Sequence, residues 1–497
     1  MHKGTIWLAL LLNGCASAAA YRGPQVEIPT AFRERLDSLA PPPPAPSTVP
    51  TVAGDTVTPV GEYWRALDDS TLNRLLDEAL GGNLDVAAAQ ARIRGARASK
   101  LETTLDFVPT VTAVGGYTRQ RLSGATFPIG NGTFPDQDIW DAGFDASWEL
   151  DLFGRIRRGV QARGALVGAA EEDLRDIRVS LAAELARVYF ELRGAQEQLA
   201  VAQRNAENQR RTLELTRQRL DAGRGTAFDT ERAQAQLSIT LASVPRLESQ
   251  VAAAQYRLGV LVGRPPAAVA RELEQAAAMP SLPVTVAVAA PDSLIRRRPD
   301  VAAAERRIAA EHAFVGVAKA DYLPRLNLGG SAGFSSADFG DLGGDGTFRY
   351  AVGPVITWPA LNLGRVKARV DVARSLEDEA RAQYNQTVLL ALEDVESALV
   401  SYRTSLRQVD RFGEAAQASG RAAELARLRF TGGVADFLQC STPSARSSRP
   451  RTNWHLAAPR LRPPTRRCIR RWGGSGPRGG RRAERPAGPA LGGFCGA

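Results

Sequence analysis

Side chains that could carry covalent or metal chemistry are scarce in this chain of 497 residues. Most of its few histidines and cysteines lie near the two ends, which leaves His312 as the single imidazole of the long middle part. A zinc site, a Ser/His/Asp triad or a Cys/His dyad needs more ligands or partners than that. The sequence therefore predicts no metal and no cofactor. The full set is His2, His312, His455, Cys15, Cys440, Cys468 and Cys495.

One segment matches the sequence pattern of a catalytic nucleophile. The segment from Gly329 to Gly333 (GGSAG) fits the pattern G-x-S-x-G, but a nucleophile elbow needs a sharp turn from strand to helix. Here the residues alternate as in a strand, and the next histidine is His455 in the C-terminal tail. The glycine-rich stretch 343–346 has no lysine after it, so it predicts an exposed loop and not a phosphate-binding loop. The chain is predicted not to be an enzyme.

The N-terminus carries the pattern of an export signal. A cationic start precedes an apolar run, Thr5 to Leu12, that is too short to span a bilayer as a helix. The following Leu-Asn-Gly-Cys15 resembles the lipobox of bacterial lipoproteins, which predicts cleavage before Cys15 and acyl chains attached to it. We expect a signal peptide at 1–14 and a lipid-anchored, extended segment with a proline-rich spacer at 15–60. An ordinary signal peptide cut near residues 18–20 is the alternative.

The formal charge of +10 is concentrated at the C-terminus. Residues 441–497 hold 13 arginines and one glutamate, a net charge of +12, which leaves −2 for the rest of the chain. A protein surface for nucleic acid needs positive charge on the folded body. Nucleic-acid binding is therefore excluded for the body of the chain.

An internal duplication organises the middle of the chain. The segment Asp85-Val-Ala-Ala-Ala recurs at Asp300, a spacing of 215 residues, and Gly154-Arg recurs at Gly364, a spacing of 210. A five-residue difference in one loop accounts for the change, so both matches belong to one duplication. The first repeat is expected at 61–290 and the second at 291–439.

Each repeat has two segments with strand periodicity. In the clearest, from Trp140 to Leu152, apolar residues alternate with acidic or small ones. One apolar and one polar face, with aromatic residues near the strand ends, is typical of a membrane β-barrel, and a soluble sandwich with one wet face is the alternative. Because four strands cannot close a barrel and hydrocarbon tolerates no open edge, several copies are expected to share one sheet. The expected strands are 109–119, 139–153, 323–335 and 348–363.

A very long helix follows the strands of each repeat. No proline occurs between residues 154 and 222, which predicts a helix of roughly 100 Å at about 1.5 Å per residue. Glycines at Gly223 and Gly433 mark the turns that follow the long helices. The predicted fold class is mainly α, with long antiparallel helical hairpins beside four strands. The expected helices are 154–222 and 229–263 in the first repeat and 364–431 in the second.

Together these features resemble the TolC-like outer-membrane efflux proteins, in their lipoprotein branch. The most specific stretch runs from Leu294 (LIRRRPDV) to Pro324 (GVAKADYLP). Two further segments are similar to family motifs, Trp148–Arg155 (WELDLFGR) and Val244–Glu248 (VPRLE). The resemblance covers about residues 60–440.

The resemblance implies a homotrimer in which each protomer gives four strands to a twelve-stranded outer-membrane barrel, continued by a periplasmic α-barrel of helical hairpins. It implies the exit channel of a tripartite efflux pump, which conducts drugs and toxic compounds passively from the periplasm to the exterior. The partners would be a periplasmic adaptor and an inner-membrane transporter. The expected type of transporter is RND. The protein would lie in the bacterial outer membrane, among its lipids, and extend into the periplasm.

Residues at the hairpin tips are the candidate gate. Family members close their periplasmic end by polar contacts there and open like an iris, so the resemblance implies Arg224, Asp229 and Asp436 as gate residues. The position where some relatives carry a turn aspartate is Ala435 here. An exposed acidic residue at a helix start is also an ordinary cap, so this second role stays open.

The tail departs from the family at Cys440, where the helical period stops. When the third base of each codon is read with the first two bases of the next, Gln439 to Arg446 permit Val-Leu-Asp-Ala-Gln-Arg and then Ala, Ser or Thr. The next eight codons permit Leu-Leu-Glu-Ala-Glu-Asp-Gln-Leu, and both stretches are similar to the family's last helix. We predict that a one-base change near codon 440 puts residues 440–497 out of frame as a disordered, Arg-rich tail without the second return helix.

Two other protein classes share part of this pattern. A periplasmic membrane-fusion adaptor also pairs helical hairpins with β structure and can be lipid-anchored, but its β domains are soluble. A type I secretion duct would have the same architecture and a different cargo. The repeated strand alternation beside aromatic residues favours a channel over an adaptor.

Overall fold

The structure is a computed structural model that describes residues 21, 23–24, 28–29, 31–32, 68–122, 135–280 and 290–431. The chain divides after Leu461 into two units, and all the described residues belong to the first. The expected signal peptide, Cys15, Asp436 and the tail from Cys440 lie outside the described residues.

The described elements repeat in the order helix, strand, strand, long helix. In the first repeat these are α3, β1, β2 and α4, and in the second they are α8, β3, β4 and α9. The elements are α2 (Ser70–Gly82), α3 (Leu84–Leu105), β1 (Thr110–Gln120), β2 (Gln137–Leu150), α4 (Arg155–Asp221), α5 (Ala227–Val262), α6 (Pro266–Glu272), α7 (Pro291–Arg296), α8 (Pro299–Ala320), β3 (Arg325–Ser336), the 3-10 turn η4 (Phe339–Asp341), β4 (Phe348–Thr357) and α9 (Leu363–Thr431).

The strands and long helices lie close to their expected ranges, with one clear difference at β4. The sequence predicts this strand up to residue 363, and that end is wrong, because β4 stops at Thr357. Pro359 follows two residues later, and a proline cannot donate the amide hydrogen that a strand ladder needs. The return helix α5 begins at Ala227, slightly before the expected 229, because Thr226 caps it.

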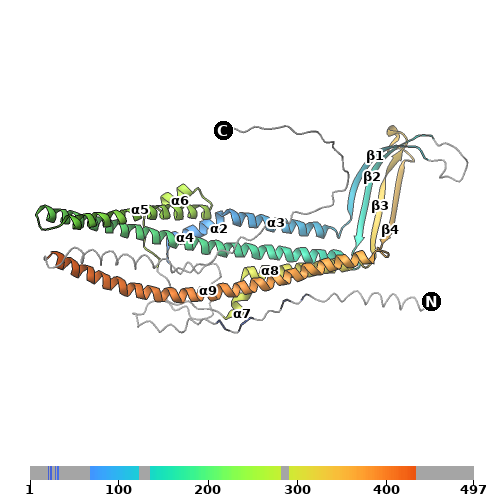
Figure 1. Ribbon diagram of the computed structural model, residues 1–497. Helices are drawn as coiled ribbons and strands as arrows, with labels where there is room; N and C mark the ends of the chain where they lie inside the picture. The colour runs from blue at the N-terminus through green and yellow to red at the C-terminus, as the bar shows by residue number, and fades with distance from the viewer. Residues whose placement is uncertain are drawn as a thin grey trace, which may run out of the picture. The chain divides into compact units, whose positions relative to one another are not determined.

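Strands β1 to β4 form one antiparallel sheet in chain order (Figure 1). In its register Thr112 pairs with Asp145, Asp145 with Ser331 and Ser331 with Ala351. Paired residues point to the same face of a sheet. The alternating apolar residues of all four strands therefore share one face, and the polar and small residues share the other. β1 and β4 are the two edges, and no other described strand lies beside either of them.

Two apolar clusters hold the return helix α5 against α4, and Figure 1 shows the two helices side by side. The larger cluster, at the base of the hairpin, also draws residues from α2 and α6 and buries Leu185, Leu192 and Leu258 completely. Each such leucine stabilises the fold by roughly 1.5–3 kcal/mol. The smaller cluster lies further along the hairpin and consists of Ala206, Leu213, Ala233 and Leu237.

The short helix α8 joins the two repeats because it packs against both α4 and α9. On the α4 side, Arg307 Nη2 lies 2.6 Å from Asp173 Oδ2, and the Arg163 guanidinium lies 5.6 Å from the centroid of the Phe314 ring. On the α9 side, an apolar cluster joins α7 and α8 to α9. Its buried members are Ile295, Val301, Val388 and Ala391.

Candidate functional site

The polar face of the sheet carries five charged residues among many small ones, and four of them are paired. Arg349 Nη2 donates to Asp141 Oδ1 at 3.0 Å across the sheet. Glu149 accepts two hydrogen bonds of 2.7 Å from the Arg155 guanidinium at the start of α4. Arg325 lies 2.5 Å from Asp321. For Asp145 the described residues offer no basic group within ion-pair distance. The five are Asp141, Asp145, Glu149, Arg325 and Arg349.

A pair of glycines makes the contact between Arg349 and Asp141 possible. Gly143 and Gly333 lie opposite each other on β2 and β3, and a Cβ atom on Gly333 would come within 2.6 Å of the Gly143 Cα. Any larger residue would push the strands apart. Gly333 is also the cross-strand partner of Arg349. The arginine side chain therefore crosses a position without a side chain to reach the next strand.

The apolar face ends in a matched pair of tryptophans next to the long helices. Trp148 Nε1 donates to the Phe107 carbonyl at 2.8 Å, and Trp358 Nε1 donates to the Tyr322 carbonyl at 3.0 Å. The two contacts are equivalent in the two repeats, since the tryptophans are 210 residues apart and the acceptors 215. An indole that is apolar on one side and hydrogen-bonded on the other is typical of the boundary between lipid and water.

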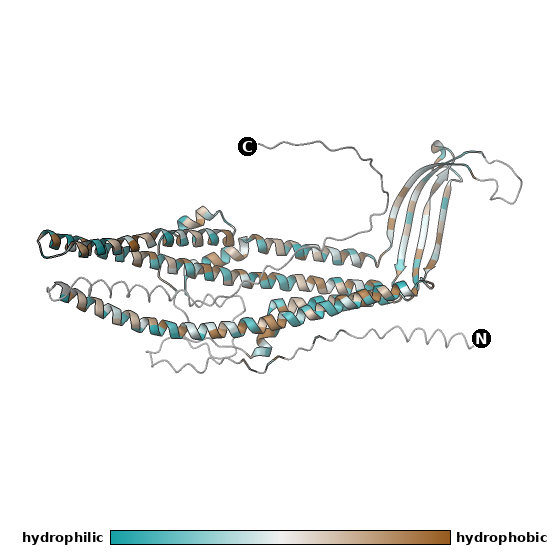
Figure 2. Ribbon diagram, in the orientation of Figure 1, coloured by the Kyte–Doolittle hydropathy of each residue, from teal (hydrophilic) through white to brown (hydrophobic). Residues whose placement is uncertain are grey.

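Aromatic rings also occupy the opposite end of the apolar face. The Trp140 ring lies 4.5 Å from that of Tyr117 and 5.1 Å from that of Phe339. Between the two ends, Phe144 and Tyr350 are 61% and 75% exposed, so the face is uncovered in the single chain. None of the described helices is long and apolar enough to cross a bilayer, and Figure 2 shows hydrophobic and hydrophilic residues mixed along all of them.

At the tip of the first hairpin, Arg224 helps to end α4. Gly223 has a φ of 70°, in the left-handed region that glycine adopts without strain. The Gly223 N–H donates to Leu220 O at 2.9 Å and the Arg224 N–H donates to Arg219 O at 2.8 Å, which closes the helix by a Schellman-type cap. The Arg224 side chain is exposed.

The second tip residue, Asp229, contacts Thr226, the N-cap of α5. The Asp229 N–H donates to Thr226 Oγ1 at 3.3 Å, and that hydroxyl donates to Asp229 Oδ2 at 2.7 Å. This contact supports the capping role that the sequence left open. Of the expected gate residues, the structure brings Arg224 and Asp229 into one turn, while Asp436 lies outside the described residues. The lipid-attachment residue Cys15 also lies outside them.

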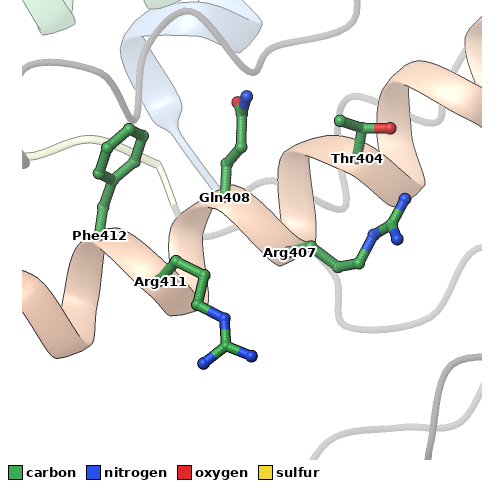
Figure 3. A pocket seen from close by; sticks show the side chains of 5 residues that line it. All are labelled: Thr404, Arg407, Gln408, Arg411 and Phe412. Carbon is green, nitrogen blue, oxygen red and sulfur yellow. The ribbon is translucent and has the colours of Figure 1, made fainter.

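Among the described residues, the surface pocket and the G-x-S-x-G segment lie on different elements, α9 and β3. A surface pocket is lined by side chains of α9 alone, and ligand pockets normally gather groups from several elements (Figure 3). Ser331 of the G-x-S-x-G segment lies inside β3 and not at a turn into a helix. Within the described ranges, no three His, Cys, Asp or Glu residues could hold a metal ion together. The pocket residues are Thr404, Arg407, Gln408, Arg411 and Phe412.

One carboxyl on α4 has a strongly shifted pKa. The pKa of Asp176 is raised to about 6, mainly by burial and also by the nearby Asp300, while Arg298 opposes the shift. The group lies near the start of α8, on the part of α4 that this helix covers. No sequence pattern marks it, because its neighbours come from the other repeat.

A sheet with one apolar and one polar face, two open edges and long helical hairpins attached defines the subunit of an outer-membrane channel. The family described as outer membrane efflux protein matches residues 75–264 and 290–449 of this chain. The chain belongs to the outer membrane efflux protein family. This assignment confirms the predicted family and favours the channel over the adaptor.

Individual relatives agree along most of their length. Outer membrane protein OprJ of Pseudomonas aeruginosa is 30% identical over 433 residues, 87% of this chain and 87% of the relative. Nodulation protein T of Rhizobium leguminosarum bv. trifolii is 29% identical over 406 residues, 82% of each chain. The solved structure of the outer-membrane channel OprN matches with a TM-score of 0.76 and 36% identity over 88% of this chain and 96% of that one. These matches confirm the predicted fold class, the outer-membrane location and the function as an efflux channel.

Proposed function

We propose that three copies of this chain form the exit duct of a tripartite pump for drugs and other toxic compounds, joined to a periplasmic adaptor and an RND-type inner-membrane transporter. The proposal rests on the open four-stranded sheet, which has one apolar and one polar face. An exposed strand edge in hydrocarbon leaves backbone groups unpaired, so β4 of one copy pairs with β1 of the next until the barrel closes. A relative named as an antibiotic efflux pump outer membrane protein, ArpC of Pseudomonas putida, is 27% identical and supports drug export over protein secretion.

The duplication also supports a specific helix contact between copies. Within the chain, Arg158 of α4 covers Gly316 of α8, where a Cβ atom would lie 3.2 Å from the arginine Cδ. By the repeat spacings, the equivalent positions are Ala368 on α9 and Leu101 on α3. Ala368 is exposed, and Leu101 is 58% exposed. The large residue is on α4 in the first contact (Arg158 against Gly316) and would be on α3 in the second (Leu101 against Ala368). Packing α3 of one copy on α9 of the next would therefore cover Leu101.

A disulfide test addresses this contact. The double variant Leu101→Cys with Ala368→Cys is expected to give a covalent trimer on non-reducing gels after mild oxidation in outer-membrane preparations. The two single variants are matched controls, since they keep all the native cysteines and lack one partner. A double variant that cross-links no more than the single variants would overturn the proposed arrangement of copies.

Arg224, Asp229 and Asp436 are proposed as residues of the periplasmic gate. The exposed tip and its charged side chains support this role, and the hydrogen bonds of Asp229 with the N-cap Thr226 support the alternative for Asp229. Thr226→Ala removes the cap and keeps the charge, whereas Asp229→Asn removes the charge. A gate residue predicts higher conductance in planar bilayers for Asp229→Asn alone. Equal effects of both substitutions would leave Asp229 as a cap only.

Cys15 is proposed as the lipid-attachment residue that anchors the mature N-terminus in the outer membrane. The lipobox-like sequence before it supports this assignment. Labelled palmitate should enter the parent chain and not a Cys15→Ser variant. A parent chain that takes up no label would favour the ordinary signal peptide instead, because cleavage near residues 18–20 removes Cys15.

The frame change near codon 440 is part of the same proposal, and the packing of the first hairpin supports it. Ala233 and Leu237 of α5 cover Ala206 and Leu213 of α4. In the shifted frame, positions 443 and 447 would carry an alanine and a leucine, 210 residues after Ala233 and Leu237. The restored segment would therefore present the same two apolar residues to α9. Resequencing codons 435–480 should reveal one further base, and a confirmed present frame would mean a truncated protein.

A further inference from the structure

The three acidic residues of the polar face lie at separate heights along β2. Asp141, Asp145 and Glu149 are four residues apart, which is about 13 Å at 3.3 Å per residue. The Debye length at physiological ionic strength is about 8 Å, shorter than this separation. Each height is therefore screened from the next. The local field at each height depends on the charges that lie nearest to it.

Only the middle height keeps an uncompensated charge among the described residues. Asp141 is neutralised by Arg349, and Glu149 by both guanidinium contacts of Arg155. The row of Asp145 continues through Thr112, Ser331 and Ala351, none of which is charged. The neighbouring row on the side of the long helices holds only small residues, so nothing bulky shields the Asp145 carboxylate. These residues are Thr110, Ser147, Gly329 and Gly353.

We propose that Asp145 sets the charge preference of the duct, favouring inorganic cations and cationic solutes over anions of the same size. The inference rests on the proposed trimer, in which three copies place three such carboxylates at one height around a water-filled lumen. The nearest cation on the polar face, Arg349, is held on the far side of Gly333 by Asp141. A lumen with this ring attracts positive charge at mid-height, where no described side chain opposes it.

Reversal potentials in planar bilayers under a KCl gradient test the proposal. Two forms of the full chain are measured, one with the present sequence and one with the reading frame restored near codon 440. The parent is expected to prefer K⁺ over Cl⁻, and Asp145→Asn should bring the permeability ratio close to one. The matched control is the double variant Asp141→Asn with Arg349→Gln, which removes a neutral pair and leaves the net charge unchanged. It should keep the parental ratio. An unchanged ratio in Asp145→Asn, or an equal loss in the control, would overturn the proposal.

A local reporter separates this height from the periplasmic gate. Ser331→Cys places a thiol in the row of Asp145. The rates at which this thiol reacts with cationic and with anionic methanethiosulfonates are compared. The parent chain serves as the control for reaction at the native cysteines. Adding Asp145→Asn should lower the cation-to-anion rate ratio by roughly fivefold, since a unit charge about 5 Å away acts oppositely on the two reagents. An unchanged ratio in a conducting channel overturns this inference alone. If no form of the chain conducts, the proposed channel assembly fails as well.

Discussion

The two long helices, α4 and α9, are equivalent by duplication but differ in which described elements cover them. They are 67 and 69 residues long. Toward its tip, α4 buries Leu213 against α5, and Leu213 is only 4% exposed. Toward the end of α9, Leu425 is 62% exposed, and no described helix returns alongside it. A long amphipathic helix depends on packing for its stability, because its own propensity contributes little. The two helices are therefore expected to differ in stability toward their tips.

The largest expected difference between the two helices is in protection from proteolysis. Cleavage needs local unfolding, which costs little where a helix has no packed face. Limited trypsin digestion, followed by mass spectrometry, should cut the outer part of α9 at least a hundredfold faster than the outer part of α4. The frame-restored chain should lose this difference. The arginines compared are Arg204, Arg210 and Arg211 on α4 and Arg407, Arg411 and Arg421 on α9.

Equal cleavage rates in the chain with the present reading frame would contradict the proposal that this chain lacks the second return helix. The frame-restored chain is the matched control, because its α9 has the same sequence up to residue 431. Protection that appears only after restoration assigns the difference to the return helix. Any intrinsic weakness of α9 would persist in both chains.

A matched pair of leucine truncations sharpens the comparison at single residues. Leu213→Ala removes a side chain from the cluster with Ala206, Ala233 and Leu237 and should lower the free energy of unfolding by about 2–4 kcal/mol. Leu425→Ala removes an exposed side chain and should change it by less than about 0.5 kcal/mol. Denaturant unfolding curves give both values. A large cost for Leu425→Ala in the printed chain would show that something covers α9.

Much of the fold could be predicted from the sequence because the duplication provides each element twice. The pattern of one repeat is supported by its counterpart in the other, as that of β1 is by β3. Strand periodicity also predicted which residues share a face. The predicted end of β4 was wrong because the apolar alternation continues past Thr357 to Trp358. The pattern does not show where the hydrogen bonds of the strand stop.

The contacts of the site were less predictable, since they join residues that are distant in sequence. The pair of Arg349 and Asp141 spans two strands and depends on Gly333 between them. Neither the register nor the glycine pair can be read from one strand. The capping role of Thr226 could have been found, because Thr226 and Asp229 have the spacing of a capping box.

The smallest expected effect concerns a charge that only the first repeat carries. Asp176 on α4 corresponds to Gln386 on α9, which is exposed. Burial raises the pKa of Asp176 to about 6 from 3.8, with Asp300 adding to the shift and Arg298 opposing it. The folded state therefore binds the proton more tightly than the unfolded state, and stability falls as the pH rises from about 4 to about 6.

Asp176→Asn removes this titration and should stabilise the protein by about 2 kcal/mol at pH 7, a value reduced for partial exposure, with no gain at pH 4. Unfolding measured at several pH values between 4 and 7 gives the slope. Gln386→Asp is the matched control, because a carboxylate at that exposed position of α9 keeps its water and should leave the slope unchanged. An Asp176→Asn variant with the parental slope would show that burial at the contact of α4 and α8 does not penalise the charge, and this difference between the two repeats would disappear.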